Sequence, residues 1–310
     1  MAISISNLWK PTARDLREIA ENAKAASAIL AMPLLKRRAH MIEFGYRRHL
    51  YKFRDIPDDL GKRKRLEQML LDNELFAATS DTFNDPFDAQ ADYRIEQQGD
   101  ALREVVYRYF RSQGADDHLA RGLVADALLD DSAALAASIK ANHQQLLQQL
   151  GVCCLAETAT DPLLWAHYAQ NHRGIAVQYR PSLDPMSLQP HPVHYNATYP
   201  IIENFFDREK RDIFSPLLRK APSWEYEREW RILRPNAPNR GFQVRPEALT
   251  AVLLGMRISD DDREYIRGLV AERDKRYEVK TLVFQAEAAV GEYRVRMRRL
   301  RTAAATTGGK

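Results

Sequence analysis

Hydrophobic residues near the start of the chain follow the spacing of a helix. In TARDLREIAENAKAASAIL apolar side chains recur every three or four positions, which predicts a helix over residues 12–47 with a break at Pro33. The basic run KRRAHMIEFGYRRH at the end of this region has the composition of a solvated helix face, and a binding patch is the alternative. We expect residues 1–47 to form a helical extension of the main domain.

The pattern changes to alternation at residue 50. Polar and apolar side chains alternate in LYKFR, residues 50–54, which predicts a short strand that ends before Pro57. The following apolar spacing predicts a helix from Asp59 to about Asn73, and residues 74–78 predict a second strand. The turn-rich stretch SDTFNDPFD closes this unit.

The rest of the chain divides into a helical part and a part that mixes strands with helices. Residues 95–150 are predicted to be wholly helical, in three segments separated by short polar breaks. Beyond them, the predicted strands are 151–156, 174–180, 191–196, 227–235, 251–255, 277–285 and 293–300, and the predicted helices are 161–173, 204–221 and 261–273. Residues 251–255 lack any polar alternation, which indicates a buried strand.

These elements predict an α+β fold. We expect one domain over residues 48–300, with a mixed, largely antiparallel β-sheet flanked by helices and with a helical insertion at 95–150. Residues 301–310, TAAATTGGK preceded by an arginine, are predicted to be a disordered tail.

Composition narrows the class of protein. Hydrophobic residues make up 45% of the 310 residues and charged residues 28%, which is ordinary for a soluble globular protein. The net charge of +4 fits a nucleic-acid or phosphate-rich partner, and a mildly basic enzyme has the same charge.

The two cysteines and the apolar stretches indicate a cellular location. Cys153 and Cys154 are adjacent and no other pair exists, so no disulfide framework is expected and a reducing, cytoplasmic location is predicted. The first residues lack the pattern of a signal peptide. The longest uncharged apolar stretch, residues 25–35, is shorter than the ~20 residues of a membrane span. An effector delivered without a cleavable signal would share these features.

The first cluster with chemical potential is FNDPFD, residues 83–88. Asn84 and Asp85 before a proline suit a turn, because their side chains cap backbone amides and proline presets φ. The two phenylalanines that bracket the turn would fix it against the rest of the domain. The stretch is therefore either a structural turn or a turn that holds two carboxylates, of Asp85 and Asp88, at a site.

The second cluster is DPLLWAHYAQNHRGIAVQY, residues 161–179. Asp161 and the proline after it predict a helix start, and Gly174 predicts its end. On such a helix His167 and His172 would lie about 140° apart, so they do not form a two-histidine metal site. We expect Trp165 to pack in the core, and His167 with Tyr168 to line a pocket.

The third cluster is WEYEREWRIL, residues 224–233. Read as a strand, it places Glu225, Glu227, Glu229 and Arg231 on one face. Carboxylates on a buried face would have raised pKa values or would need cations. A solvated face with Arg231 paired to Glu229 is the alternative. We favour Glu229 or Glu227 as a functional carboxylate.

Five stretches of this sequence follow one another in the same order as the motifs of a known family. They are LYKFR, NELFAATSDTFNDPFD, LLWAHYAQNHRGIAVQY, WEYEREWRIL and VLLGMRIS, and no GxxxxGK, GxGxxG, GxSxG or HExxH motif accompanies them. The series resembles a bacterial domain-of-unknown-function family, DUF2971, in Tyr-Lys-x-Arg, Asn-Asp-Pro-Phe-Asp, Trp-x-His-Tyr-Ala with a following Gly, and Glu-x-Glu-Trp-Arg. The resemblance covers roughly residues 50–298 and implies no activity.

The order of residue types is also similar to that of ADP-ribosyltransferases. Those enzymes have a small split mixed sheet, an early-strand Arg or His that holds NAD, an aromatic residue near the nicotinamide, and a late-strand Glu that stabilises an oxocarbenium-like sugar. By this analogy Arg54 would anchor the pyrophosphate, and Tyr168 or Trp165 would stack on a ring of the cofactor. Glu229 would bind the ribose hydroxyl, and Glu227 would orient the acceptor or act as its base.

The analogy defines a set of candidate residues. The predicted catalytic residues are Glu229, Glu227, His167 and Tyr168, and the predicted cofactor-binding residues are Arg54, Tyr51, Asn84, Asp85, Trp165 and Arg231. The predicted cofactor is NAD, and the acceptor is a protein or a nucleic acid. Such a transferase would fit a bacterial toxin, an effector or a phage-defence protein.

A different function remains open from the same residues. Asp85, Asp88, His167 and Glu229 would suit a metal-dependent phosphodiesterase, with the basic runs KRRAHMIEFGYRRH and YRVRMRRL on nucleic-acid phosphates. A non-enzymatic binding module, in which the motifs only stabilise the fold, is the third hypothesis.

Overall fold

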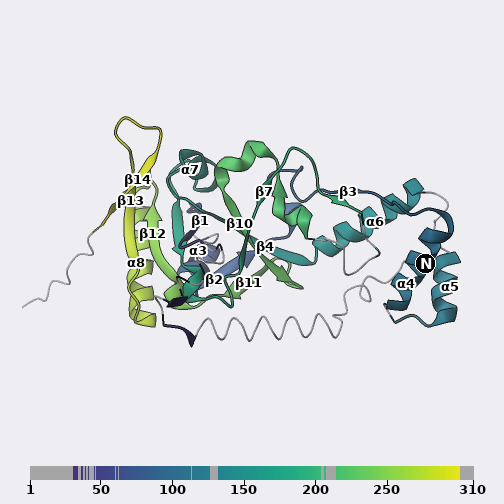
Figure 1. The fold of residues 1–310 in the computed structure, drawn as a ribbon. Coiled ribbons are helices and arrows are strands. Elements are labelled where there is room, and N and C mark those ends of the chain that lie inside the picture. Colours follow the sequence, from purple (N-terminus) through teal and green to yellow (C-terminus); the bar gives the residue numbers. More distant parts are fainter. Residues whose placement is uncertain are drawn as a thin grey trace, which may run out of the picture.

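The computed structural model describes residues 31–300 apart from 34–35, 38, 40, 42–44, 46, 60, 62, 113, 126–131, 204–205 and 207–213. Within these residues the centre of the fold is an eight-stranded sheet with the order β14-β13-β12-β5-β1-β4-β10-β6. All neighbouring strands run antiparallel except β12 and β13. The predicted α+β class with a mixed, largely antiparallel sheet is confirmed (Figure 1).

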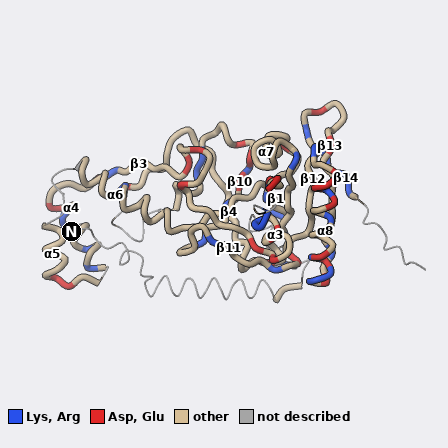
Figure 2. Tube along the Cα trace, turned by 180° about the vertical axis from the view of Figure 1, so that it is seen from behind, with Lys and Arg blue, Asp and Glu red and all other residues tan. Residues whose placement is uncertain are grey.

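One part of the sheet contains five strands. β1 (Leu50–Arg54) pairs along its whole length with β5 (Ile175–Tyr179), and β5 pairs with the buried β12 (Leu249–Leu254). The helix α8 (Asp260–Tyr277) connects β12 to the parallel strand β13 (Leu282–Ala288), and β14 (Val295–Arg299) forms the edge. Charged residues of both signs follow one another along α8, as Figure 2 shows.

The other part of the sheet contains three strands. β4 (Leu150–Ala156) pairs with β10 (Glu229–Pro235) over seven residue pairs, and β10 pairs with β6 (Pro190–Pro192). The two parts meet only at one pair, Tyr51 with Ala156. Because β4 ends at Ala156, the two strands diverge on one side of that pair, along Lys52–Arg54 of β1, and the sheet is nearly split between them.

Three short strand pairs surround the sheet. β2 (Glu74–Ala77) pairs with β11 (Arg240–Gln243), β3 (Asp92–Tyr93) with β8 (Ile201–Ile202), and β7 (His194–Tyr195) with β9 (Arg219–Lys220). Ala78 forms one further bridge to Val152 of β4. This bridge attaches the β2–β11 pair to the three-stranded part of the sheet.

Hydrophobic clusters cover both faces of the sheet. On one face α3 (Lys64–Leu71) and α8 pack on Leu50, Val177 and Val252. On the other face α7 (Pro162–Tyr168) packs through Leu164 and Trp165 on Phe53. Burial of this apolar surface is the main stabilising contribution to the fold.

The insertion predicted at 95–150 is helical where the structure describes it. It comprises α4 (Gly99–Ser112), α5 (Asp117–Ala125) and α6 (Ser132–Leu147). These helices bury a cluster of their own with the β3–β8 pair, including Leu102, Val106 and Ile202. Figure 1 shows α4 and α5 at the end of the molecule far from β14.

Several element boundaries differ from the predictions. α3 begins at Lys64 and not at Asp59, and β13 begins at Leu282 and not at residue 277. The described end of the predicted helix 204–221 is a 3₁₀ turn, Ser215–Leu218, followed by β9. The predicted helix 12–47, with the basic run at its end, and the tail 301–310 lie largely or wholly outside the described residues.

No helix in the described part of the chain is both long and apolar enough to cross a bilayer.

Candidate functional site

A pocket of about 500 Å³ lies where β1 and β4 diverge. Its volume is in the usual range of small-molecule sites, which is about 300–1,000 Å³. Residues from both parts of the sheet, the FNDPFD turn, α3, β2 and α7 line it. Among the described residues, its charged lining consists of five basic side chains, of Lys52, Arg54, Arg65, Lys220 and Arg231, and three carboxylates, of Asp88, Glu227 and Glu229.

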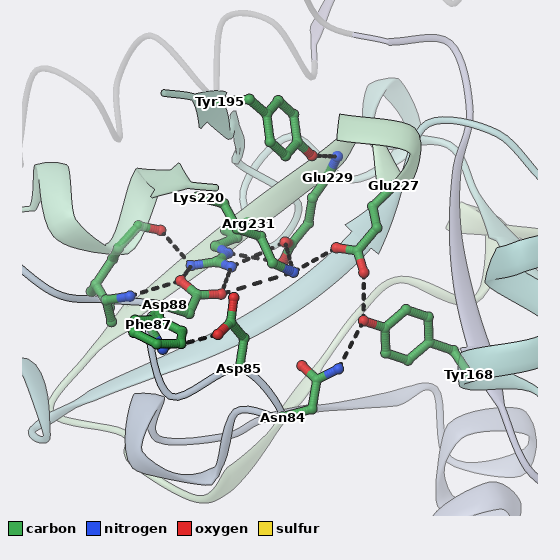
Figure 3. Close-up of polar contacts among 12 residues, drawn as sticks. Asn84, Asp85, Phe87, Asp88, Tyr168, Tyr195, Lys220, Glu227, Glu229 and Arg231 are labelled. Atoms are coloured by element: carbon green, nitrogen blue, oxygen red, sulfur yellow. Dashed lines mark hydrogen bonds and ion pairs between the residues drawn. The ribbon is translucent and has the colours of Figure 1, made fainter. Parts of the chain in front are cut away.

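Arg231 is the centre of a buried ion cluster at one end of the pocket (Figure 3). Its two terminal nitrogens donate to both carboxylate oxygens of Asp88, at 2.9 and 2.5 Å, in a bidentate pair. Its Nε donates to Glu229 Oε1 at 2.8 Å, and its guanidinium lies 4.9 Å from the Phe83 ring centroid. Arg231 thus fixes the FNDPFD turn onto β10.

Lys220 lies among the same carboxylates and is buried with them. Its Nζ donates to Glu227 Oε2 at 2.6 Å and to Glu229 Oε2 at 3.3 Å, and it is 3.9 Å from Asp88 Oδ2. The ammonium group also lies 4.6 Å from the Trp224 ring centroid. Three buried carboxylates therefore share two cations, which is how burial of several charges is tolerated.

The pKa values of the two glutamates, Glu227 and Glu229, are shifted in opposite directions. Burial alone would raise the pKa of Glu229, but the Arg231 guanidinium and the Lys220 ammonium outweigh it and lower that pKa to about 2. For Glu227, burial outweighs the attraction of Lys220 and raises the pKa above its ordinary value. The Lys220 pKa is raised because the two glutamates more than offset its burial. Glu229 is a fixed anion, whereas Glu227 titrates closer to neutral pH.

Glu227 ends a hydrogen-bond chain that reaches α7 and the FNDPFD turn. Tyr168 Oη donates to Glu227 Oε1 at 2.5 Å and accepts from Asn84 Nδ2 at 3.2 Å. Burial and the Glu227 carboxylate both raise the Tyr168 pKa, so the phenol keeps its proton and its orientation. Figure 3 shows Tyr168 and Asn84 on the Glu227 side of the ion cluster, away from Arg231.

Glu227 and Glu229 are both buried, and the residue between them has a left-handed backbone conformation. Pro222–Glu227 is a 3₁₀ helix and β10 begins only at Glu229, so the predicted strand 227–235 starts two residues too early. The alternative of a strand over the whole of 224–233 is wrong in its first half. Arg228 between the two glutamates has φ 44°, which is strained for a residue with a side chain. This reversal turns Glu227 to the same side as Glu229, while Glu225 is exposed.

Gly174 positions β1 and does not cap a helix. α7 begins as predicted, with Asp161 accepting from the Leu163 amide, but it ends at Tyr168, six residues before Gly174. A Cβ atom at Gly174 would lie 2.1 Å from the Arg54 carbonyl oxygen. The glycine is needed for this close backbone approach, which holds the end of β1 beside the loop after α7.

A second set of basic residues, which we call the basic end of the pocket, comes from β1 and α3. β1 contributes Lys52 and Arg54, and α3 contributes Arg65. Lys52 Nζ donates to the Cys154 carbonyl at 2.9 Å, and the Arg65 guanidinium lies 3.7 Å from the Phe76 ring centroid. Lys52 and Arg65 thus contact a carbonyl and a ring, whereas Lys220 and Arg231 contact carboxylates. We call the lining that Lys220 and Arg231 contribute the ion-paired end.

Seven of the ten predicted site residues line this pocket, namely Tyr51, Arg54, Asn84, Tyr168, Glu227, Glu229 and Arg231. The other three lie elsewhere. Trp165 is fully buried in the core, where its Nε1 donates to the Ala159 carbonyl. Asp85 accepts from the Phe87 amide within its own turn. His167 is exposed and lies against the rings of two aromatic residues, Trp224 and Tyr226.

The geometry does not assemble the residues of the phosphodiesterase hypothesis. His167 is outside the pocket, Asp85 caps its turn, and Asp88 and Glu229 are bound by Arg231. Among the described residues no group of three or more His, Cys, Asp or Glu side chains could hold a metal ion.

Sequence reasoning missed Lys220, Lys52 and Arg65. Lys220 falls in a stretch predicted to be helical, but it lies in β9, which pairs with β7. A signal existed, because three carboxylates predicted to be buried require more than one cation, and Arg231 alone does not supply them. Lys52 is the lysine of the Tyr-Lys-x-Arg motif, but the resemblance gives it no role. Arg65 carries no local signal, since an arginine on a helix is an ordinary surface residue.

Fold and pocket define an α+β protein with a charged pocket at the junction of two sheet parts. Residues 164–232 match the family model described as "Protein of unknown function (DUF2971)". The predicted resemblance is confirmed over these residues, which contain the Trp-x-His-Tyr-Ala and Glu-x-Glu-Trp-Arg motifs. No curated protein and no solved structure matches the chain.

Proposed function

We propose that this chain is a transferase of the ADP-ribosyltransferase type that takes NAD in the pocket between β1 and β4. One observation carries the proposal. The sheet is joined by a single residue pair at this point, and the pocket there faces Arg54 of the first strand on one part and the Glu227–Glu229 pair on the other. This is the arrangement that the analogy in the sequence requires.

The pocket lining is chemically suited to such a ligand. The Arg54 side chain makes no hydrogen bond or ion pair with the described residues, so its terminal guanidinium nitrogens keep their donors for an anionic ligand, although Nε itself is buried. Tyr51, Phe76 and Phe83 add aromatic surface for the rings of a nucleotide. When bound, NAD supplies an activated glycosidic bond between ribose and nicotinamide.

Glu227 is the better candidate for the reacting carboxylate. Glu229 accepts three hydrogen bonds from Arg231 and Lys220, and these hold it as a structural anion. Among the described residues, each oxygen of Glu227 accepts one hydrogen bond, Oε2 from Lys220 and Oε1 from Tyr168. Because a carboxylate oxygen can accept two hydrogen bonds, Glu227 keeps capacity for a sugar hydroxyl or for the proton of an acceptor.

The test compares two glutamates two residues apart. The full chain is incubated with NAD, and nicotinamide release and the melting temperature are measured for the wild type, Glu227→Gln and Glu225→Gln. We expect NAD to raise the wild-type melting temperature. Glu227→Gln should lose about 10²–10³-fold in rate, the usual effect of removing one group that stabilises developing charge. The exposed Glu225 is the matched control and should change nothing.

Absence of both stabilisation and nicotinamide release in the wild type would overturn the proposal. An equal loss in Glu225→Gln and Glu227→Gln would contradict the role of Glu227. Near-UV circular dichroism of each variant shows whether a loss of activity comes from a loss of fold.

A further inference from the structure

Three cations at the basic end of the pocket lack an anionic partner. Lys52, Arg54 and Arg65 make no ion pair with any carboxylate in the part of the chain that the structure describes, whereas Lys220 and Arg231 at the other end contact three. Like charges gathered on one side of a concave site repel one another, and the low-dielectric walls strengthen that repulsion. An arrangement of this kind is stabilised when an anion enters.

Of the three cations, Arg54 has the fewest partners among the described residues. Its side chain is half-buried, and its Nε is shielded from solvent with neither water access nor an acceptor among the described residues. A shielded donor without a partner costs about 1–3 kcal/mol, and an anion on the terminal nitrogens of the same guanidinium would offset that cost. The Gly174 contact with the Arg54 carbonyl fixes the backbone from which this side chain extends.

Lys52 and Arg65 complete the set in complementary ways. Lys52 is half-buried, and its ammonium uses one of three donors on the Cys154 carbonyl, which leaves two for a ligand. Arg65 is exposed, and its guanidinium carbon lies 3.7 Å from the Phe76 ring centroid, a contact that uses none of its N–H donors. Two forked donors and one point charge therefore line the same end.

We propose that Lys52, Arg54 and Arg65 form a subsite for the diphosphate group of a nucleotide. A guanidinium fork binds two phosphate oxygens at once, and an ammonium adds a further charge-assisted hydrogen bond. Three cations are more than a single carboxylate requires and match a group with several anionic oxygens. The inference rests on the proposed function only in placing both ligand parts in one pocket, with the phosphates at β1 and the sugar toward Glu227.

The experiment measures binding of ADP, adenosine and inorganic pyrophosphate to the full chain by isothermal titration calorimetry. ADP should bind at least tenfold more tightly than adenosine, and pyrophosphate should compete with ADP. Arg54→Gln, Lys52→Gln and Arg65→Gln should each weaken ADP about tenfold or more, because a charge-assisted hydrogen bond contributes about that factor, and leave adenosine unchanged. Lys64→Gln, next to Arg65 on α3 and outside the pocket lining, is the matched control.

The outcomes separate this inference from the proposed function. Equal affinity for ADP and adenosine, or ADP affinity unchanged in all three variants, would overturn the subsite even if NAD were cleaved. Binding of a single-stranded oligonucleotide that depends on these cations while ADP fails to bind would overturn it too. ADP binding lost in the variants, together with intact NAD that is never cleaved, would support the subsite and refute the transferase.

Discussion

Both ends of the pocket carry basic side chains, but those of one end are paired with carboxylates and those of the other end are not. At the β10 end, Arg231 and Lys220 are buried and every donor group faces a carboxylate or a carbonyl. At the β1 end, the basic groups are less buried and no carboxylate faces them among the described residues. The first end holds the fold together and presents Glu227. Under the proposed function, the second end would bind the ligand, and binding sites commonly reduce the stability of the free protein.

The largest expected effect is at the ion-paired end. Arg231→Met removes the partner of both Asp88 and Glu229 and leaves two buried carboxylates with Lys220 alone. Breaking a buried ion pair from one side costs about 3–5 kcal/mol, so the free energy of unfolding from urea denaturation should fall by that amount.

The control for this variant is an exposed ion pair. Arg267→Met breaks a surface contact with Glu264 on α8 and should change the free energy of unfolding by less than about 1 kcal/mol. If both variants had the same small effect, the ion cluster would not be a structural anchor, and the distinction between the two ends of the pocket would fail.

The sequence predicts the strands of this fold better than the points at which its helices end. β1, β4 and β12 were found because alternation or continuous apolar residues report burial locally. The end of α7 was not found, because three consecutive residues after it, Gln170 to His172, adopt positive φ although none is glycine. Tertiary contacts impose that backbone, and local spacing does not report it.

For the site, the motifs identified the acidic end and only part of the basic end. Glu227, Glu229 and Arg231 lie close in sequence, so a strand pattern brought them together even though Arg228 interrupts the strand. Lys220 and Arg65 reach the pocket through β9 and α3, whose positions depend on pairings that are distant in sequence. Charge balance is the only local argument that anticipates such partners.

An effect of intermediate size should appear in acid. Because its folded-state pKa is lowered to about 2, Glu229 contributes stability above its ordinary pKa of 4.5, and this stability is lost as the pH falls from that value toward 2. The difference corresponds to roughly 3 kcal/mol. Urea denaturation between pH 2 and pH 6 should show this fall in the wild type.

Replacing the carboxyl group removes that dependence. Glu229→Gln should be less stable than the wild type at pH 6, and its stability should fall less steeply below pH 4.5. Glu227 has the opposite sign, because its raised pKa favours the protonated folded form as the pH falls. Parallel pH curves for Glu229→Gln and the wild type would show that Arg231 and Lys220 do not hold Glu229 as an anion.

The smallest expected effect tests the basic end. Arg54→Gln removes a guanidinium that has no ion pair among the described residues, so the free energy of unfolding without ligand should change by less than about 0.5 kcal/mol or rise slightly. A rise would reflect relief of repulsion with Lys52 and of the unpaired donor. If the free energy of unfolding fell as much as in Arg231→Met, Arg54 would be a structural residue. The two ends of the pocket would then differ in burial but would both stabilise the fold.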